Sequence, residues 1–277
     1  MTTIKENHNH AKKSKFMNIG IIGYGAIGQA LYQSITTGEG DTLHCPAVLV
    51  RRARGVGSVP LCTDPDDFLA QPLDAVVECA GHQAVRDLAA RVLTQADLLV
   101  TSVGALTDDG LRDNLRTTAK TAAHKLIIPS AGIGALDMLS AAAVGGLEQV
   151  SISVRKNIEA WYGTPAEQQV DLANLKQATT VYEGPVRAGA ALYPGNVNIS
   201  AAVALAGIGL DRTQLRIIAD PTIHSHIIDV EAQGAFGRFH FMEDVLPSTD
   251  NPKTGRIVAM ALRKTLHHLA SEWVIGA

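Results

Sequence analysis

The feature that most constrains the fold is a glycine pattern close to the start of the chain. Residues 17–22 (MNIGII) form an apolar run typical of a buried strand, and the glycines that follow are spaced G-x-G-x-x-G before a helical pattern begins. The first glycine permits a tight turn, the second lets the backbone approach a pyrophosphate, and the third lets the helix pack against the strand. The helix N-terminus then offers free N–H groups to phosphate. The pattern predicts a dinucleotide site made by Gly23, Gly25, Ala26, Ile27 and Gly28.

The second predicted strand, residues 46–50 (PAVLV), bears on which dinucleotide binds. In NAD-selective sites an acidic residue follows this strand and holds the ribose 2′-hydroxyl, whereas here Arg51 and Arg52 follow. A guanidinium at this point can pair with a 2′-phosphate. We therefore expect NAD or NADP as the cofactor, with NADP accepted and a preference for it left open. The alternative is that both arginines are solvated loop residues.

Predicted strands and helices continue to alternate as far as residue 130. The strands are expected at 74–80, 97–106 and 125–130, and the helices at 83–93 and 109–122. Such alternation is typical of an α/β, Rossmann-type, doubly wound parallel sheet, whose ligand lies over the carboxyl ends of the strands. We assign residues 17–135 to a dinucleotide-binding domain.

Loops rich in small residues follow these strands, at 80–82, 102–105 and 130–134. Small side chains would let a nicotinamide ring approach, and Ala80 and Gly81 are expected beside the cofactor. His82 is a candidate acid or base, but a loop histidine held by a backbone hydrogen bond is the simpler interpretation.

After residue 136 the pattern becomes that of a smaller α+β domain, expected over residues 136–252. Strands are expected at 148–157 and 177–184, followed by three consecutive antiparallel strands between 213 and 245, the last two joined by a glycine-rich turn at 234–237. A helix opened by an asparagine cap is expected over 196–210. A final helix, 253–272, is expected to pack back on the dinucleotide-binding domain. We expect the second domain to carry the substrate and the contact of a homodimer.

Composition excludes several other classes of protein. The 277 residues are 46% hydrophobic and 18% charged, with a net charge of −3, so nothing attracts nucleic acid or an anionic membrane. No apolar run in the sequence reaches the roughly 18–20 residues of a membrane span. The three cysteines, at 45, 62 and 79, have neither disulfide nor metal-ligand spacing, and we expect no metal. Residues 1–16 are polar and basic, which predicts a disordered tail rather than a signal peptide, and a cytoplasmic location.

Motifs in the second half resemble those of the L-aspartate dehydrogenases. The chain contains, in order, PSAGIGALD (129–137), LYPGNVN (192–198), ADP…GAFG (219–237) and DNPKT (250–254). The resemblance extends over nearly all of the chain from Met17 onward. It implies an NAD(P)-dependent enzyme, commonly dimeric, with a Rossmann domain and a second α/β domain. Such enzymes convert L-aspartate to iminoaspartate, which hydrolyses to oxaloacetate and ammonia.

The resemblance also implies cofactor contacts. Gly132 stands where the family usually has alanine, in a loop that touches the cofactor, and the local order Ala-Gly instead of Gly-Ala leaves a backbone contact available. Asn196, the first asparagine of PGNVN, matches a cofactor-binding asparagine, whose amide can both donate and accept. The alternative is that Asn196 caps the following helix, and the two roles are compatible.

The catalytic histidine of the family lies in the pattern D-P-x-x-x-x-N-x-H, from which this chain departs. Counted from Asp220, His226 stands at the asparagine position and Ile228 at the histidine position. A local shift would let His224 and His226 act as the pair, with His226 as the base. Positions 226 and 228 share one face of a strand and lie about 6.5 Å apart, a large displacement for catalytic geometry. The base is therefore either His226 or a group that has been lost or relocated.

Oxidation of an amino acid needs a base whose pKa is near the working pH, a water molecule activated for attack, and cationic or N–H partners for the substrate carboxylates. Candidates for the last role are Arg155, Lys156 and Lys253, each of which is otherwise a surface charge. The leading hypothesis is an aspartate dehydrogenase. The alternatives are an oxidoreductase for a different amine or imine, and a cofactor-binding protein that has lost dehydrogenase activity. The glycine loop fits all three.

Overall fold

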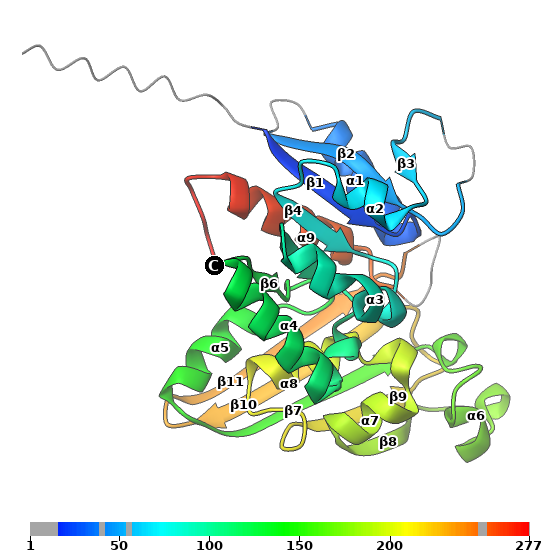
Figure 1. The fold of residues 1–277 in the computed structure, drawn as a ribbon. Coiled ribbons are helices and arrows are strands. Elements are labelled where there is room, and N and C mark those ends of the chain that lie inside the picture. The colour runs from blue at the N-terminus through cyan, green and yellow to red at the C-terminus, as the bar shows by residue number, and fades with distance from the viewer. Residues whose placement is uncertain (1–15, 39–41, 54–56, 249–253, 277) are drawn as a thin grey trace, which may run out of the picture.

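The structure is a computed structural model that describes residues 16–38, 42–53, 57–248 and 254–276. Within these residues the chain builds two sheets, and helices of the second half lie between them (Figure 1). Of the tail expected over residues 1–16, all but Phe16 lies outside the described residues. No helix among the described residues combines the length and apolar character needed to cross a membrane.

The first sheet carries the glycine pattern at its centre. In the described part of the chain it has six parallel strands in the order β3-β2-β1-β4-β5-β6. The strands are β1 (Met17–Ile22), β2 (Leu43–Leu49), β3 (Leu61–Cys62), β4 (Ala75–Glu78), β5 (Asp97–Val100) and β6 (Leu126–Ile127). The helices are α1 (Ala26–Thr36), α2 (Pro65–Leu69), α3 (His82–Leu93) and α4 (Asp109–Ala122). The strand order reverses at β1, which confirms the predicted Rossmann-type sheet and places its switch point at the glycine loop.

Strands β4, β5 and β6 are shorter than expected, β5 by the largest margin. The strand predicted over 97–106 ends at Val100, and Val103–Thr107 form a 3₁₀ helix, η1. Buried Glu78 accepts hydrogen bonds from the backbone N–H (3.0 Å) and the hydroxyl (2.9 Å) of Ser102, and these contacts turn the chain out of the sheet. The apolar run that followed was therefore helical rather than extended, a choice that periodicity alone does not make for short segments.

The second sheet is mixed. As far as the chain is described, its order is β11-β10-β7-β9-β8, with β7 (Leu147–Lys156), β8 (Thr179–Pro185), β9 (Gln214–Ala219), β10 (His226–Gly234) and β11 (Gly237–Val245). The helices on its inner face include α5 (Leu136–Gly145), α7 (Val186–Leu192) and α8 (Asn198–Ala206). Shorter elements are η2 (Ile158–Ala160), α6 (Ala166–Gln169), η3 (Leu172–Asn174) and η4 (Pro194–Asn196). This confirms the predicted second domain of mixed α and β structure.

The expected run of three neighbouring strands between 213 and 245 is wrong in one respect. β10 and β11 do form an antiparallel hairpin through Gly234 and Gly237, but β7 lies between β9 and β10 and is parallel to β9. The end of β9 is tied to the end of β7 because the Asp220 N–H donates to the Lys156 carbonyl at 2.9 Å and Arg155 pairs with the Asp220 carboxylate at 3.5 Å. Local periodicity predicts a strand but not its neighbour.

The predicted asparagine cap is also wrong. α8 begins at Asn198, its N-cap is Val197, and no side chain caps it. Asn196 belongs instead to the preceding turn η4, and its side chain lies outside the described residues.

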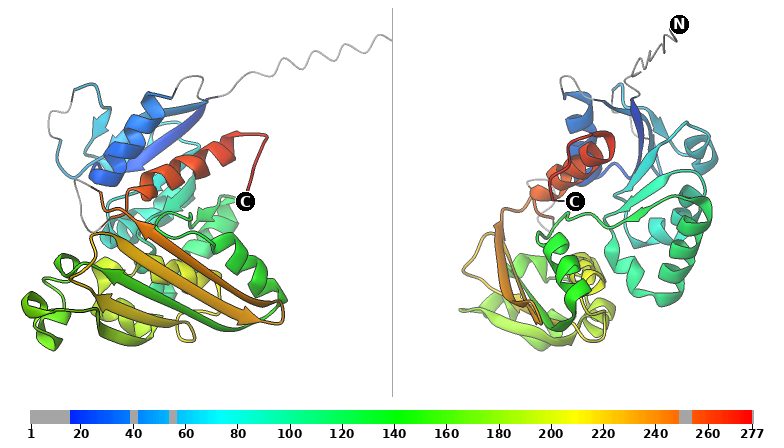
Figure 2. Two further views of the ribbon diagram at one scale, coloured as in Figure 1. Left: turned by 180° about the vertical axis from the view of Figure 1, so that it is seen from behind. Right: turned by 90° about the vertical axis from the view of Figure 1, so that its left-hand side faces the viewer.

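The last helix returns to the first sheet. α9 (Ile257–Ala270) buries Val258, Leu262 and Leu266, four residues apart, in one cluster with Leu31 and Ile35 of α1. This spacing puts the three side chains on one stripe of the helix. The chain therefore closes on its own N-terminal half, with α9 beside α1 (Figure 2).

Candidate functional site

A cavity of about 310 Å³ lies where the two sheets meet. Its wall comes from the loops after β4, β5 and β6, from α8 and the start of α9, and from the adjacent ends of β7, β10 and β11. Both halves of the chain therefore contribute, as expected for a ligand site between domains. A second hollow, beside α6 and lined by Tyr162 and residues 167–172 among others, carries neither the glycine loop nor a histidine on its wall.

The glycine loop has the backbone that a pyrophosphate site requires. Gly23 has φ +99°, a conformation that other residues rarely adopt, and a Cβ on Gly28 would lie 2.2 Å from the Gly23 carbonyl oxygen. At Gly25 a Cβ would meet nothing within 4 Å, and Gly25 caps α1 without any side-chain hydrogen bond. The first N–H groups of α1 thus face open space, which fits the phosphates of a dinucleotide. Ile27 of the same turn lines the cavity.

Two of the cofactor-facing loops are organised by Glu78, which sequence reasoning missed. This residue is 1% exposed, and one carboxyl oxygen accepts the N–H groups of both Ala80 and Gly81 at 2.7 Å. The carboxylate also accepts from Ser102, so it holds the loops after β4 and β5 together. A buried carboxylate with several donors is a stable arrangement. The available signal was a single acidic residue inside the apolar run AVVECA.

Gly132 lies on the cavity wall together with Ala131 and Ile133. A Cβ at position 132 would lie 3.2 Å from Ile199, so the neighbour would have to shift slightly. The loop after β6 therefore occupies the place predicted for it, with its backbone close to the cavity.

His82 and Asn198 join the two halves of the molecule. His82 begins α3, and its Nε2 lies 3.0 Å from Oδ1 of Asn198, which also accepts the Gly104 N–H at 2.9 Å. The expected backbone partner of His82 is wrong, since its partner is this side chain. Asn198 lines the cavity, whereas His82 does not. The structure thus places Asn198, the second asparagine of PGNVN, at the site, while the side chain of Asn196, the predicted cofactor contact, lies outside the described residues.

The three positions of the histidine motif are separated clearly. His226 is 6% exposed and Ile228 is 1% exposed, and both line the cavity from β10, while His224 precedes the strand and is exposed. Across the hairpin, Val245 is opposite His226 and Glu243 is opposite Ile228. The structure therefore brings His226 to the cavity and leaves His224 outside it.

The three residues proposed as cationic partners of a substrate carboxylate differ in their position relative to the cavity. Lys156, at the end of β7, is 3% exposed, lines the cavity, and has its Nζ 6.0 Å from the ring of Trp161. Arg155 points to the opposite face of the sheet, where it pairs with Asp220. Lys253 lies outside the described residues. Lys156 is thus the candidate that can meet a ligand in the cavity.

Arg51 and Arg52 are exposed and follow β2. The end of β2 is adjacent to the glycine loop, because the Gly23 N–H donates to the Leu49 carbonyl at 2.8 Å. The pair therefore lies near the switch point.

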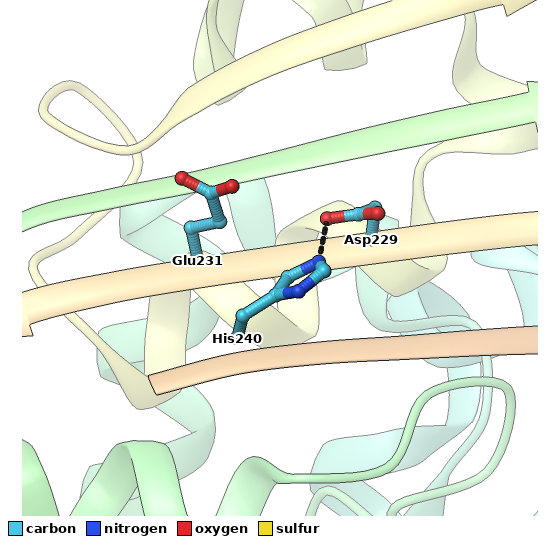
Figure 3. Close-up of side chains that lie close together, drawn as sticks. All are labelled: Asp229, Glu231 and His240. Carbon is cyan, nitrogen blue, oxygen red and sulfur yellow. Dashed lines mark hydrogen bonds and ion pairs between the residues drawn. The ribbon is translucent and has the colours of Figure 1, made fainter. Parts of the chain in front are cut away.

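A cluster on the outer face of the second sheet lies away from the cavity. Asp229, Glu231 and His240 have potential ligand atoms within 4.8 Å of one another, and His240 Nε2 lies 2.6 Å from Asp229 Oδ1. Figure 3 shows His240 on β11 reaching to Asp229 on β10, with Glu231 further along the same strand. The three could hold a metal ion, but the ion pair already accounts for their proximity. Residues 228 and 230 point to the other face, so this cluster has no access to the cavity.

Comparisons with known proteins divide the chain in the same place. The family model described as "Homoserine dehydrogenase, NAD binding domain" matches residues 23–129, and "Aspartate dehydrogenase, C-terminal" matches residues 137–269. The L-aspartate dehydrogenase of Ralstonia nicotianae is 38% identical over 269 residues, covering 92% of this chain and 98% of the relative. That of Pseudomonas aeruginosa is 38% identical over 265 residues, covering 90% and 96%.

Solved structures share the fold. The aspartate dehydrogenase of Thermotoga maritima has a TM-score of 0.73 at 24% identity, covering 94% of this chain and 99% of the other. A hyperthermophilic archaeal homoserine dehydrogenase, solved in complex with NADPH, has a TM-score of 0.59 at 11% identity over 94% of this chain and 99% of the other. These likenesses bear on the fold, and the two sequence relatives bear on the family.

Proposed function

The chain belongs to the L-aspartate dehydrogenase family, and from this premise we propose that it oxidises L-aspartate with NAD or NADP. The reaction takes L-aspartate, water and the oxidised cofactor to oxaloacetate, ammonia and the reduced cofactor, through iminoaspartate, or runs in reverse. The observation that carries the proposal is the cavity, which combines the cofactor-facing loops with a buried histidine and a buried lysine, His226 and Lys156.

The cofactor would be held by the glycine loop and by the loops after β4, β5 and β6. Gly23 and Gly28 have the backbone that a pyrophosphate site needs, and Gly25 leaves free space beside it. When bound, the cofactor accepts the hydride from the substrate's Cα. Ala80, Gly81 and Gly132 leave room beside the cavity for its reactive ring.

His226 is the candidate base. The substrate amine must lose a proton before hydride leaves Cα, and an imidazole titrates near neutral pH. After oxidation, and once the histidine has released this first proton to solvent, the same group can remove a proton from a water molecule that attacks the imine carbon, and can return it to the departing ammonia. Burial in the cavity wall puts the ring where substrate must lie. His224, exposed outside the cavity, serves neither step.

Lys156 is the candidate partner of a substrate carboxylate. Its ammonium is nearly excluded from solvent, and a charge-assisted contact in such a place is stronger than one at the surface. The Asn198 amide, on the same wall, can donate to a second oxygen or to the cofactor. These two residues offer polar contacts for a dicarboxylate in the cavity.

Ile228 favours a second candidate function, in which the chain uses another amine or has lost the reaction. An isoleucine cannot accept a proton, and it occupies the position of the family's histidine. The variant Ile228→His separates the two readings. A gain in aspartate turnover of tenfold or more would identify a degraded site. Turnover that does not rise supports His226 as the base where the wild type already turns over aspartate, and supports a different substrate where it does not.

Three finer points belong to this proposal. NADP is accepted, supported by the exposed arginines 51 and 52 beside the glycine loop. The protein works in the cytoplasm, supported by its composition. It forms a homodimer, supported by the outer face of the second sheet, where the described part of the chain lays no helix and Met242 is 56% exposed. Light scattering after size exclusion tests the last point.

The activity is tested with purified protein, oxaloacetate, ammonium and NADPH or NADH. The expected result is ammonium-dependent loss of reduced-cofactor absorbance together with an equal amount of L-aspartate identified by chiral chromatography. Tight cofactor binding without turnover would contradict the proposal and favour a chain that has kept its cofactor and lost its reaction.

A further inference from the structure

Glu243 is a partly buried carboxyl group that the proposed reaction does not use. It lies on the inner face of β11, directly opposite Ile228, and its strand neighbour two residues on, Val245, lines the cavity. Side chains opposite each other on one face of a sheet have Cβ atoms about 5 Å apart. Glu243 therefore lies beside Ile228, next to the part of the cavity wall that Ile228 forms.

The cofactor-facing loop after β6 is seated on this part of β11. The Gly134 N–H donates to Oε2 of Glu243 at 3.3 Å. Phe241 packs so closely on the loop that a Cβ at Gly134 would lie 2.5 Å from its ring. The residues just before Gly134 are Ala131, Gly132 and Ile133, which line the cavity. A contact made at Gly134 thus positions the backbone that faces the cofactor.

The other carboxyl oxygen has no partner within the described part of the chain. Oε1 of Glu243 is buried and accepts no hydrogen bond there. Burial raises the pKa of Glu243 above its usual range, and the Gly134 N–H offsets this only in part. An apolar residue would avoid this cost, and a buried unsatisfied polar atom calls for an explanation other than stability. The proximity to the cofactor loop supplies one.

We propose that Glu243 is a positioning residue, whose carboxylate anchors the cofactor-facing loop 131–134 to the second sheet and releases it in part on protonation. A hydrogen bond to an ionised oxygen is roughly twice as strong as one to a neutral oxygen. The anchor is therefore strongest when Glu243 is ionised. The inference rests on the cofactor-binding part of the proposed function and goes beyond it, because it couples the cofactor site to the state of one residue of the substrate domain.

Few other charges face Glu243 among the described residues. On the neighbouring strands, His226 of β10 and Lys156 of β7 share its face of the sheet, and Asp137 lies on α5, which follows the loop. The charged side chains of Asp229 and Asp244 point to the opposite face. The pH dependence assigned to Glu243 must therefore be separated mainly from that of His226.

The test compares full-length wild-type protein with the variants Glu243→Gln and Glu243→Leu. Glutamine keeps an acceptor for Gly134 but cannot ionise, and leucine removes the acceptor. Asp244→Asn is the matched control, because Asp244 is the next residue on β11 and is exposed on the other face. The titrant is NADH, since the 2′-phosphate of NADPH would itself titrate at about pH 6.

Binding of NADH is measured by fluorescence between pH 5 and pH 8. For the wild type, the Kd should rise about fivefold as pH falls through the raised pKa of Glu243. The Glu243→Gln protein should lose this dependence and bind at a level between the wild-type extremes. The Glu243→Leu protein should bind about tenfold more weakly at pH 8. Wild-type affinity and wild-type pH dependence in the leucine variant would overturn the proposal.

A second measurement does not depend on cofactor or turnover. Hydrogen exchange of the peptide that contains residues 130–134, followed without ligand, should be faster in Glu243→Leu than in the wild type and unchanged in Asp244→Asn. Equal exchange in all three proteins would also overturn the proposal. If the wild type binds NADH but fails to turn over aspartate, the proposed activity fails while this inference stands or falls on the variants alone.

Discussion

The glycine loop and strand β10 contribute different parts of the wall of one cavity, the loop through Ile27 and the strand through His226 and Ile228, and their residues are constrained in different ways. In the loop the backbone itself dictates the residue type: Gly23 has a positive φ, and no side chain fits at Gly28. On β10 the backbone is regular, so its conformation does not restrict positions 226 and 228 to one residue type. A cofactor site formed by backbone groups therefore requires a fixed pattern of residue types in the sequence. A catalytic side chain, by contrast, can move to another position of a regular strand without disturbing the fold.

This difference explains why one wall retains its motif and the other departs from it. A substitution in the glycine loop would distort the chain, while Ile228 is buried and well packed at 1% exposure. Position 226 meets the same cavity from the same face, one pleat along the strand. The five predictions that follow test the glycine loop, the buried lysine, the exposed arginines, Glu243 and, last, the candidate base His226.

The largest effect is expected at the glycine loop. In Gly28→Ala the new Cβ would lie 2.2 Å from the Gly23 carbonyl oxygen, so the loop must move. A displacement of about 1 Å at such a site costs on the order of a hundredfold. We expect NADH affinity, measured by fluorescence titration, to fall at least that much. Gly145→Ala is the control, since a Cβ there would meet nothing within 4 Å. Normal binding by Gly28→Ala would show that the loop is not the pyrophosphate site.

A smaller effect is expected from the buried cation. Lys156→Met removes the charge that we assign to a substrate carboxylate and keeps the length of the side chain. A hydrogen bond to a charged group contributes about 1.5–3 kcal/mol, so kcat/KM for aspartate should fall between about tenfold and a hundredfold. NADH affinity should stay at the wild-type level. Lys176→Met, at an exposed position, should change neither value. A loss confined to NADH affinity would contradict this role and indicate that Lys156 contacts the cofactor instead of the substrate.

The sequence predicted the parts of the site that depend on backbone geometry better than the parts that depend on contacts between distant side chains. Gly23, Gly25 and Gly28 and the alternation of strands and helices predicted the first sheet correctly, because backbone geometry leaves few residue types acceptable. The position of β7 between β9 and β10 could not be predicted, since a strand's alternation names its buried face and not its partner.

The polar groups of the site were harder to predict for a related reason. Glu78 is a single acidic residue in an apolar strand, and Glu243 stands beside Asp244 in a strand with several polar residues, so neither pattern marks the glutamate as an inward-facing residue. Their burial comes from contacts with loops distant in sequence, at Ser102 and Gly134. Asn198 acquires its role through the same kind of contact, with Gly104.

A moderate and selective effect is expected from the exposed arginines. Replacing Arg51 and Arg52 together with alanine should raise KM for NADP about tenfold and leave KM for NAD nearly unchanged, since a guanidinium pairs only with the 2′-phosphate. Initial rates with each cofactor check this. Equal effects on the two cofactors would contradict a role in NADP recognition.

The smallest effect is on stability at Glu243. Burial raises the folded-state pKa of Glu243, so ionisation of this group lowers the free energy of unfolding. The loss of stability is complete above the folded-state pKa. It disappears as pH falls toward the pKa of about 4.3 in the unfolded chain. Because the group is only partly shielded from solvent, we expect Glu243→Gln to raise Tm by about 2 °C at pH 8 and by nothing measurable near pH 4.5. Calorimetry at both pH values checks this. A Tm gain that grows as pH falls would reverse the sign and refute the account of Glu243.

The most direct test of the central claim is the turnover of aspartate by His226→Gln beside that of His224→Gln. The account predicts that His226→Gln binds NADH normally and loses about a hundredfold or more in kcat, the usual contribution of a general base. His224→Gln, altered at an exposed position outside the cavity, should keep wild-type turnover. Wild-type turnover in His226→Gln would contradict the claim and place the base elsewhere in the cavity.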